Sequence, residues 1–190
     1  MEDTLLKEQK IINKVESDKL NKILPLLLTF SFGGVFGFIF EEIFYYIDLG
    51  YISKRGITYG PWIPIYGFGA ILVILITSRF RKYPFALLVV SMVVCGIIEF
   101  ITGYTLHHTM GIRLWNYNEE ILNLGNIGGY VCVRSILFFG LSAMFLQYVV
   151  YPIIIKLQQQ CKPKTYKIIA IVPAVLFAID IVISIINKIF

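Results

Sequence analysis

Long apolar runs separated by short polar connections dominate the pattern of the chain. A helix needs about 20 consecutive apolar residues to cross a bilayer, and several of the runs have about that length. The second is shorter than the others, which favours a tilted or broken helix. The runs cover residues 23–47, 63–78, 84–106, 130–155 and 168–186. The pattern therefore predicts an all-α polytopic membrane bundle with about five transmembrane helices.

The segment before the first run, residues 1–22, has a different pattern. Apolar residues such as Leu5, Ile12 and Leu20 return at helical spacing, and lysines occupy much of the rest. This pattern predicts a short amphipathic helix on the cytoplasmic side, which either lies on the membrane surface or docks a cytosolic partner. The expected organisation is thus an amphipathic helix over residues 1–22 and a transmembrane bundle over residues 23–190.

Composition supports a membrane protein and narrows its partners. Hydrophobic residues make up 57% of the chain and charged residues 15%, with a mean hydropathy of +0.76. The net charge of +5 does not indicate nucleic-acid binding, because the basic residues lie mainly in the connections between apolar runs. The cysteines Cys95, Cys132 and Cys161 have no C-x-x-C spacing, so we predict neither a disulfide framework nor a metal site, and no cofactor. The bilayer itself is the first expected partner.

The basic residues also predict the orientation of the chain in the cell membrane. Positive residues concentrate in the cytoplasmic connections of membrane proteins. With the N-terminus inside, most lysines and arginines fall on the cytoplasmic side, and an odd number of spans places the C-terminus outside. The inner connections then hold Lys7, Lys10, Lys14, Lys19, Lys22, Arg79, Arg81, Lys82, Lys156, Lys162, Lys164 and Lys167, and the outer ones hold Lys54, Arg55, Arg113 and Lys188.

Charged residues inside the predicted spans are the main candidates for chemistry. Acids at such depths are costly and usually face a bundle interior or a wet cavity. In the predicted orientation Glu41 and Glu42, Glu99, Asp180 and Arg134 all lie towards the outer side. We expect Glu41, Glu99 and Arg134 to form one charge-compensated cluster, with Glu99 and Arg134 as partners. The cluster is either a ligand site or a structural ion pair, and Glu41 and Glu42 are alternatively solvated at the helix end.

The dipeptide Gly60–Pro61 reads as a turn that leads into a helix with proline in its first turn. The free N–H groups of such a helix start favour an anion, and Arg55, Arg113 and Arg134 offer donors that match phosphate or carboxylate. Alternatively, Gly60 and Pro61 only shape an irregular loop that other helices cover.

Several short motifs follow one another in a recognisable order between about residue 30 and residue 145. They are G-F-I-F-E at 37–41, R-G at 55–56, G-P-W-I-P-I-Y-G-F-G at 60–69, E-F-I-T-G at 99–103, R-L-W-N-Y at 113–117 and N-I-G-G-Y-V-C-V-R at 126–134. This set resembles the family of small bacterial membrane proteins called putative ABC-transporter permeases, type IV. The chain departs from that family's pattern at Phe38 and Leu114, where the family has tryptophan, and at Asn116, where it has aspartate.

The resemblance implies a permease or substrate-binding membrane component with a polar pocket open to the outer side. The chain has no G-x-x-x-x-G-K-[ST] motif, so the ATPase of such a transporter would be a separate subunit. A membrane enzyme that acts on a lipid-linked substrate, and a structural or regulatory subunit, remain alternatives; the substrate is a small or a lipid-linked molecule. The candidate binding residues are Glu41, Arg55, Tyr66, Glu99, Arg113, Asn126, Tyr130 and Arg134.

Cysteine labelling in intact cells tests the predicted orientation. A membrane-impermeant thiol reagent should reach an Asn118→Cys variant in intact cells, because this position lies in an outer connection. A Lys82→Cys variant serves as the control and should react only after permeabilisation. If the Asn118→Cys variant also requires permeabilisation, the orientation is wrong.

Overall fold

The computed structural model describes residues 2–52 and 54–189, with side-chain surroundings for 19–52 and 54–187. These residues form helices and loops and no strand, which confirms the all-α prediction. The elements are α1 Glu2–Leu49, α2 Pro64–Thr77, the 3₁₀ turn η1 Ser78–Phe80, α3 Pro84–Met110, α4 Val133–Phe145, the π segment η2 Leu146–Val150, α5 Tyr151–Gln160 and α6 Pro163–Ile189.

Four helical segments are long and apolar enough to cross a membrane. They are Lys19–Leu49, Pro84–Met110, Val133–Gln160 and Pro163–Asn187. The apolar helix Pro64–Phe80 is shorter, and at 1.5 Å per residue the 14 residues of α2 span only roughly 21 Å. Since the hydrocarbon layer is about 30 Å thick, α2 reaches part of the way on its own. The described residues thus confirm a bundle of about five apolar helices with a short second one.

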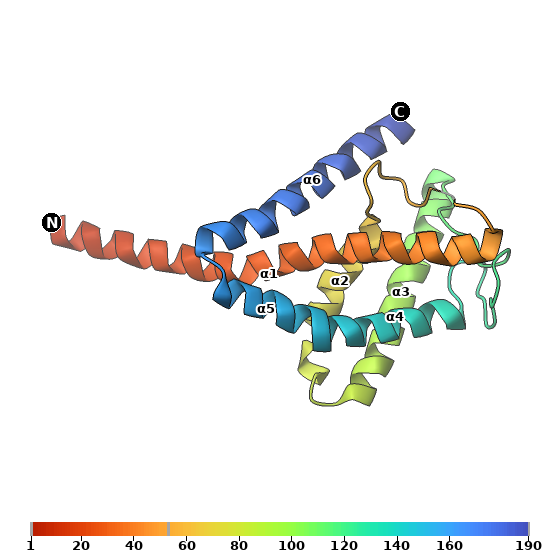
Figure 1. Cartoon of the computed structure of the whole chain (residues 1–190), viewed down its shortest axis with the longest axis horizontal. Coiled ribbons are helices and arrows are strands. Elements are labelled where there is room, and N and C mark those ends of the chain that lie inside the picture. Colours follow the sequence, from red (N-terminus) through yellow and green to blue (C-terminus); the bar gives the residue numbers. More distant parts are fainter. Residues whose placement is uncertain (1, 53, 190) are drawn as a thin grey trace.

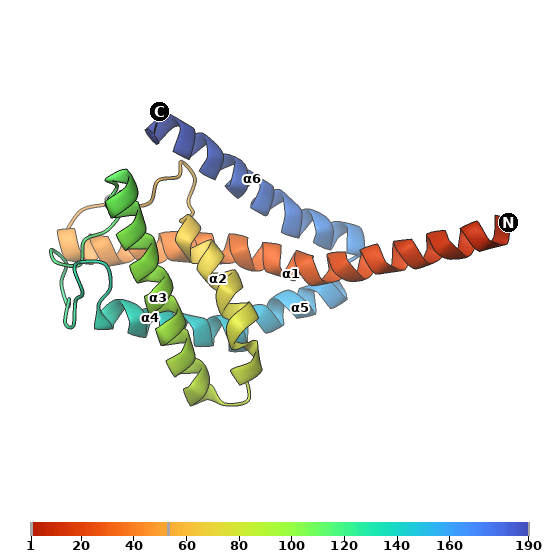
Figure 2. The same ribbon diagram turned by 180° about the vertical axis from the view of Figure 1, so that it is seen from behind.

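The helices form two layers that cross each other (Figure 1). α1 runs antiparallel to the chain of α4, η2 and α5 in one layer, and the hairpin of α2 and α3 lies across the other. Figure 2 shows the same arrangement from behind, with α2 and α3 in front. α6 begins beside α1 and then diverges from it. The most extensive packing joins α1 to α2, α3 to α4 and α1 to α6.

Glycines allow α1 and α2 to approach closely. A Cβ atom at Gly33 would lie 2.7 Å from the Cβ of Ala70 and 2.8 Å from the carbonyl oxygen of Tyr66, and a Cβ at Gly67 would lie 2.9 Å from the ring of Phe30. Side chains at these positions would force the helices apart, as expected for small residues at membrane helix interfaces. The close contact fixes the start of α2, and with it Tyr66, against the middle of α1.

The fourth helix differs from its prediction at both ends. It begins at Val133 rather than at residue 130, because Gly128 and Gly129 adopt positive φ angles of 62° and 81° and turn the chain before it. Cys132 and Ser135 then exchange hydrogen bonds at its first turn. The helix does not end at residue 155 but continues through α5 to Gln160, and the π segment η2 lies just before Pro152. A local π turn suits a residue that lacks an N–H group.

The N-terminal segment is helical and continuous with the first span, because α1 runs without a break from Glu2 to Leu49. The side chains of residues 1–18 lie outside the described residues. The amphipathic character predicted for residues 1–22 therefore stays a prediction.

One carboxylate attaches α6 to the α1–α2 loop. Asp180 accepts hydrogen bonds from the N–H of Tyr59 at 2.9 Å, the N–H of Gly60 at 2.7 Å and the indole Nε1 of Trp62 at 2.6 Å. The Trp62 ring also stacks on Phe177 of α6, with ring centroids 5.0 Å apart. Figure 1 shows this loop in the wedge between α1 and α6. Asp180 therefore holds the C-terminal half of α6 to the rest of the bundle.

Loss of this carboxylate should loosen α6. A hydrogen bond to a charged group contributes about 1.5–3 kcal/mol, so Asp180→Asn should lower the thermal midpoint of the protein in detergent. Asp48→Asn is the control, because the carboxylate of Asp48 is not among these contacts. Equal thermal midpoints for the two variants would contradict the attachment.

Candidate functional site

A polar cavity of about 630 Å³ lies between α1, α2, α3, α4 and the two long loops, the α1–α2 loop and the α3–α4 loop. Its aromatic lining includes Tyr66, Tyr117 and Phe138. Its charged lining residues are Glu41, Lys54, Arg55, Glu99, Arg113, Glu120 and Arg134. The helices contribute three of these charges and the loops contribute four, so the cavity depends on loops that fold back over the helix ends.

The first ion pair joins α1 to the α1–α2 loop. The guanidinium of Arg55 lies 3.3 Å from the carboxylate of Glu41, and both side chains are largely buried. The backbone N–H of Arg55 donates to Glu42 at 3.1 Å, and the guanidinium carbon sits 3.5 Å from the centre of the Tyr45 ring. Glu41 thus faces the cavity while Glu42 binds the loop backbone, so the two adjacent acids have different partners.

The second ion pair joins α4 to the α3–α4 loop. Arg134 lies 2.5 Å from Glu120 and also donates to the carbonyl of Ile121. Tyr45 of α1 donates its hydroxyl to the same Glu120 carboxylate. The carboxylate of Glu120 therefore connects α1 to α4. It is buried, since the Glu120 side chain is only 7% exposed.

Glu99 is the most buried of the acids, with 3% of its surface exposed. Its carboxylate accepts hydrogen bonds from the hydroxyl of Tyr117 and from Ser135, the latter at 2.8 Å. Burial and the adjacent Glu99 raise the pKa of Tyr117 well above its ordinary value, so Tyr117 keeps its proton and acts as the donor at neutral pH. A loop tyrosine and a serine of α4 thus solvate Glu99 in place of water.

The predicted pairing of Glu99 with Arg134 is wrong. Arg134 pairs with Glu120, and Glu99 bonds to Ser135, the next residue of the same helix. Neighbouring residues on a helix point about 100° apart. Because Ser135 turns towards α3, Arg134 turns away from it and towards the loop carboxylate.

Among the residues whose side chains are described, Arg113 has no carboxylate partner, in contrast to Arg55 and Arg134. It donates to the backbone carbonyls of Gly128 at 2.8 Å and Trp115 at 3.4 Å, and its guanidinium carbon lies 5.2 Å from the centre of the Tyr130 ring. Lys54 similarly stands over the ring of Tyr59, at 5.2 Å. Both side chains are exposed and line the cavity, so they are the cations available to a ligand.

Six of the eight predicted residues line the cavity: Glu41, Arg55, Tyr66, Glu99, Arg113 and Arg134. The other two, Asn126 and Tyr130, stabilise the α3–α4 loop instead. Asn126 accepts a hydrogen bond from the N–H of Gly129 at 2.8 Å, and the hydroxyl of the buried Tyr130 lies 2.7 Å from Nδ1 of His107.

Sequence reasoning missed Glu120, Tyr117 and Ser135 as partners of the buried charges. Glu120 follows Glu119 in a polar connection, and it was missed because only acids inside the apolar runs were considered as candidates. The requirement that each buried charge have a partner was the available signal, since it demands a carboxylate for Arg134 and donors for Glu99.

The helix expected after the Gly60–Pro61 turn is α2, and an anion site at its start stays a prediction. α2 begins at Pro64, and the N–H of Gly60 already donates to Asp180. Among the described residues, no three His, Cys, Asp or Glu side chains lie where they could hold a metal ion.

The fold and the cavity define the chain as a polytopic helical membrane protein with a charged cavity between its helices. Residues 28–185 match the family described as "Putative ABC-transporter type IV". Because this match covers most of the chain, the protein belongs to that family. No curated protein and no solved structure matches the chain significantly.

The partner of Arg134 is testable by a double-mutant cycle. Glu120→Gln and Arg134→Gln should each destabilise the protein in detergent melts, and the double variant should lose less than their sum by roughly 1–3 kcal/mol. Glu119→Gln is the control, because Glu119 accepts from Asn116 instead. A larger coupling of Arg134 with Glu99 than with Glu120 would contradict the assigned pair.

Proposed function

We propose that the protein is a membrane permease subunit of an ABC-type transporter and that the polar cavity binds the transported substrate. The observation that carries the proposal is the set of charges around the cavity. Membership of the family supports the transporter class. ATP hydrolysis then belongs to a separate subunit, because the chain has no P-loop motif.

The pairing of the charges supports a binding role for the cavity. Glu41 and Glu120 each hold an arginine, so these four groups compensate each other before any ligand arrives. Lys54 and Arg113 instead have aromatic and carbonyl partners, which leave their charge uncompensated. Polar groups that are already partnered need little rearrangement when a ligand binds, and this preorganisation lowers the cost of binding. The proposed ligand therefore carries an anionic group near Lys54 and Arg113.

The proposal includes an orientation. The cavity opens to the outer side, the N-terminus is cytoplasmic and the C-terminus is outside, as the distribution of basic residues favours. The part of α1 before residue 23 and the connection that contains Arg79, Arg81 and Lys82 then face the cytoplasm, where the ATPase subunit is. The bundle of residues 23–190 is the membrane domain.

Purification from native membranes in a mild non-ionic detergent tests the proposed function. Mass spectrometry should detect a small molecule retained by the wild-type protein, together with a copurified P-loop ATPase. Arg113→Gln should deplete the small molecule by about tenfold or more, since tenfold corresponds to the loss of one good interaction. Arg79→Gln is the matched control. Arg79 follows the C-terminal end of α2 and does not line the cavity, so this variant should retain the small molecule.

Two results would contradict this function. One is the same profile of retained small molecules in the wild-type protein and in the Arg113→Gln variant. The other is chemical turnover of a bound lipid-linked substrate by the isolated chain, which would indicate a membrane enzyme instead.

A further inference from the structure

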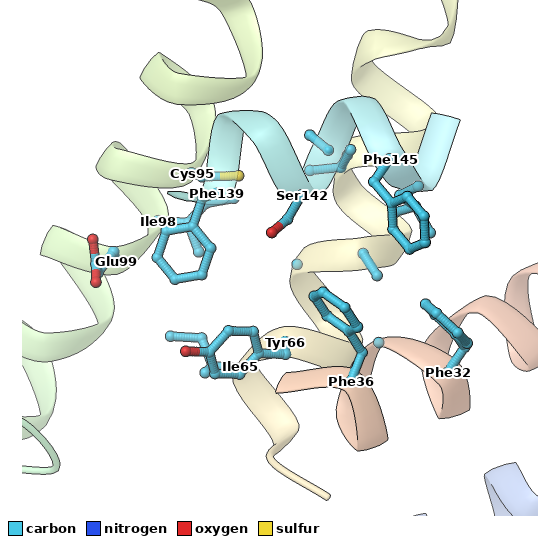
Figure 3. Close-up of a pocket in the computed structure, with 16 residues that line it drawn as sticks. Phe32, Phe36, Ile65, Tyr66, Cys95, Ile98, Glu99, Phe139, Ser142 and Phe145 are labelled. Carbon is cyan, nitrogen blue, oxygen red and sulfur yellow. The ribbon is translucent and has the colours of Figure 1, made fainter. Parts of the chain in front are cut away.

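A second cavity of about 80 Å³ lies beside the polar one, between α1, α2, α3 and α4. Its walls are almost entirely apolar, and we refer to it as the apolar cavity. Figure 3 shows the rings of Phe32, Phe36 and Phe145 around it, contributed by α1 and α4. Such walls offer dispersion contacts and exclude charge, so the space suits hydrocarbon rather than a polar group.

The two cavities share part of their walls. Six residues line both: Ile65, Tyr66, Gly69, Ile98, Glu99 and Phe139. In Figure 3 the hydroxyl of Tyr66 and the carboxylate of Glu99 lie towards one side of the group, and Phe32 and Phe145 lie on the opposite side. The polar character of the lining therefore falls off in one direction, from the charged cavity to the apolar one.

Gly69 keeps the junction between the cavities open. A Cβ atom at this position would meet nothing within 4 Å. Gly33 of α1 and Gly67 of α2 differ, because Cβ atoms at these positions would collide with the neighbouring helix. Helix packing thus explains Gly33 and Gly67 and does not explain Gly69, whose missing side chain leaves space instead of a contact.

We propose that the site binds a single-chain amphiphile with an anionic headgroup, an inference that rests on the proposed function and names its substrate class. The headgroup lies in the polar cavity near Lys54 and Arg113, and the alkyl chain passes Gly69 into the apolar cavity. A wholly polar ligand would leave the apolar walls without a partner, and a wholly apolar one would desolvate the charges of the larger cavity without compensation. An amphiphile satisfies both.

Photocrosslinking of the full chain in phosphatidylcholine nanodiscs tests this assignment. The probe is a palmitate that carries a diazirine near the end of its chain. It should label residues of the apolar cavity, such as Phe36 and the buried Ala143, and the labelling should saturate with probe concentration. Excess palmitate should compete, whereas hexadecyltrimethylammonium, which has a similar chain and the opposite charge, should not; acetate, which has no chain, should not compete either.

The variants at the junction provide the matched comparison. Gly69→Leu fills open space and should reduce labelling of the apolar cavity by about tenfold or more, while Gly69→Ala should retain most of it. Both replace a helical glycine, which favours the helix, so the thermal midpoint should not fall. Labelling of the lipid-facing residue Leu75, which is 56% exposed, should stay unchanged in both variants and reports the probe in the bilayer.

The outcomes separate this proposal from the proposed function. Labelling that does not saturate and spreads over lipid-facing residues such as Leu75, unaffected by Gly69→Leu, would overturn the amphiphile. If a retained hydrophilic molecule still depends on Arg113 and is indifferent to Gly69→Leu, the amphiphile is wrong and the permease proposal stands. If no retained molecule depends on Arg113, the permease proposal fails as well.

Discussion

Charges carried by apolar helices need partners, and in this protein the loops provide most of them. A buried charge without a partner is costly in a low-dielectric environment. Arg55 of the α1–α2 loop pairs with Glu41, and Glu120 of the α3–α4 loop pairs with Arg134. Asp180 is a further helix carboxylate with loop partners, because it accepts from the N–H groups of Tyr59 and Gly60. The same set of contacts neutralises the helices and fixes the loops.

This constraint explains why a cavity persists where the helices end. The loops cannot collapse into the bundle, since their charged side chains are held at specific helix positions, and they cannot leave it without stranding Glu41, Arg134 or Asp180. The space between these attachments is the polar cavity. Lys54 lies on the first of these loops and Arg113 on the second, and their partners are an aromatic ring and a backbone carbonyl instead of a carboxylate of the network. Some charged residues therefore pair with each other, and different ones, Lys54 and Arg113, are available to a ligand.

Much of the fold was predictable from the sequence, because long apolar runs leave few alternatives to a membrane helix. The cluster of charged residues near one end was also predictable in outline, and six of the eight candidate residues do line one cavity. The pairings were not, since hydropathy gives the depth of Glu99 and Arg134 and says nothing of which way each points around its helix. Ser135 and Arg134 are adjacent in sequence, yet they bond to different elements. The role of Asp180 was not predictable either, because its partners include backbone N–H groups that lie 121 and 120 residues away in the sequence.

Amide hydrogen exchange of the protein in lipid nanodiscs tests most directly whether helix charges hold the loops. The N–H groups of Arg55, Tyr59 and Gly60 lie outside regular secondary structure and donate to helix carboxylates, so they should exchange far more slowly than free loop amides. Asp180→Asn should speed up exchange at Tyr59 and Gly60 and leave Arg55 protected, whereas Glu42→Gln should do the reverse. Fast exchange at all three amides in the wild-type protein would show that the loops are not attached, and the account would be wrong.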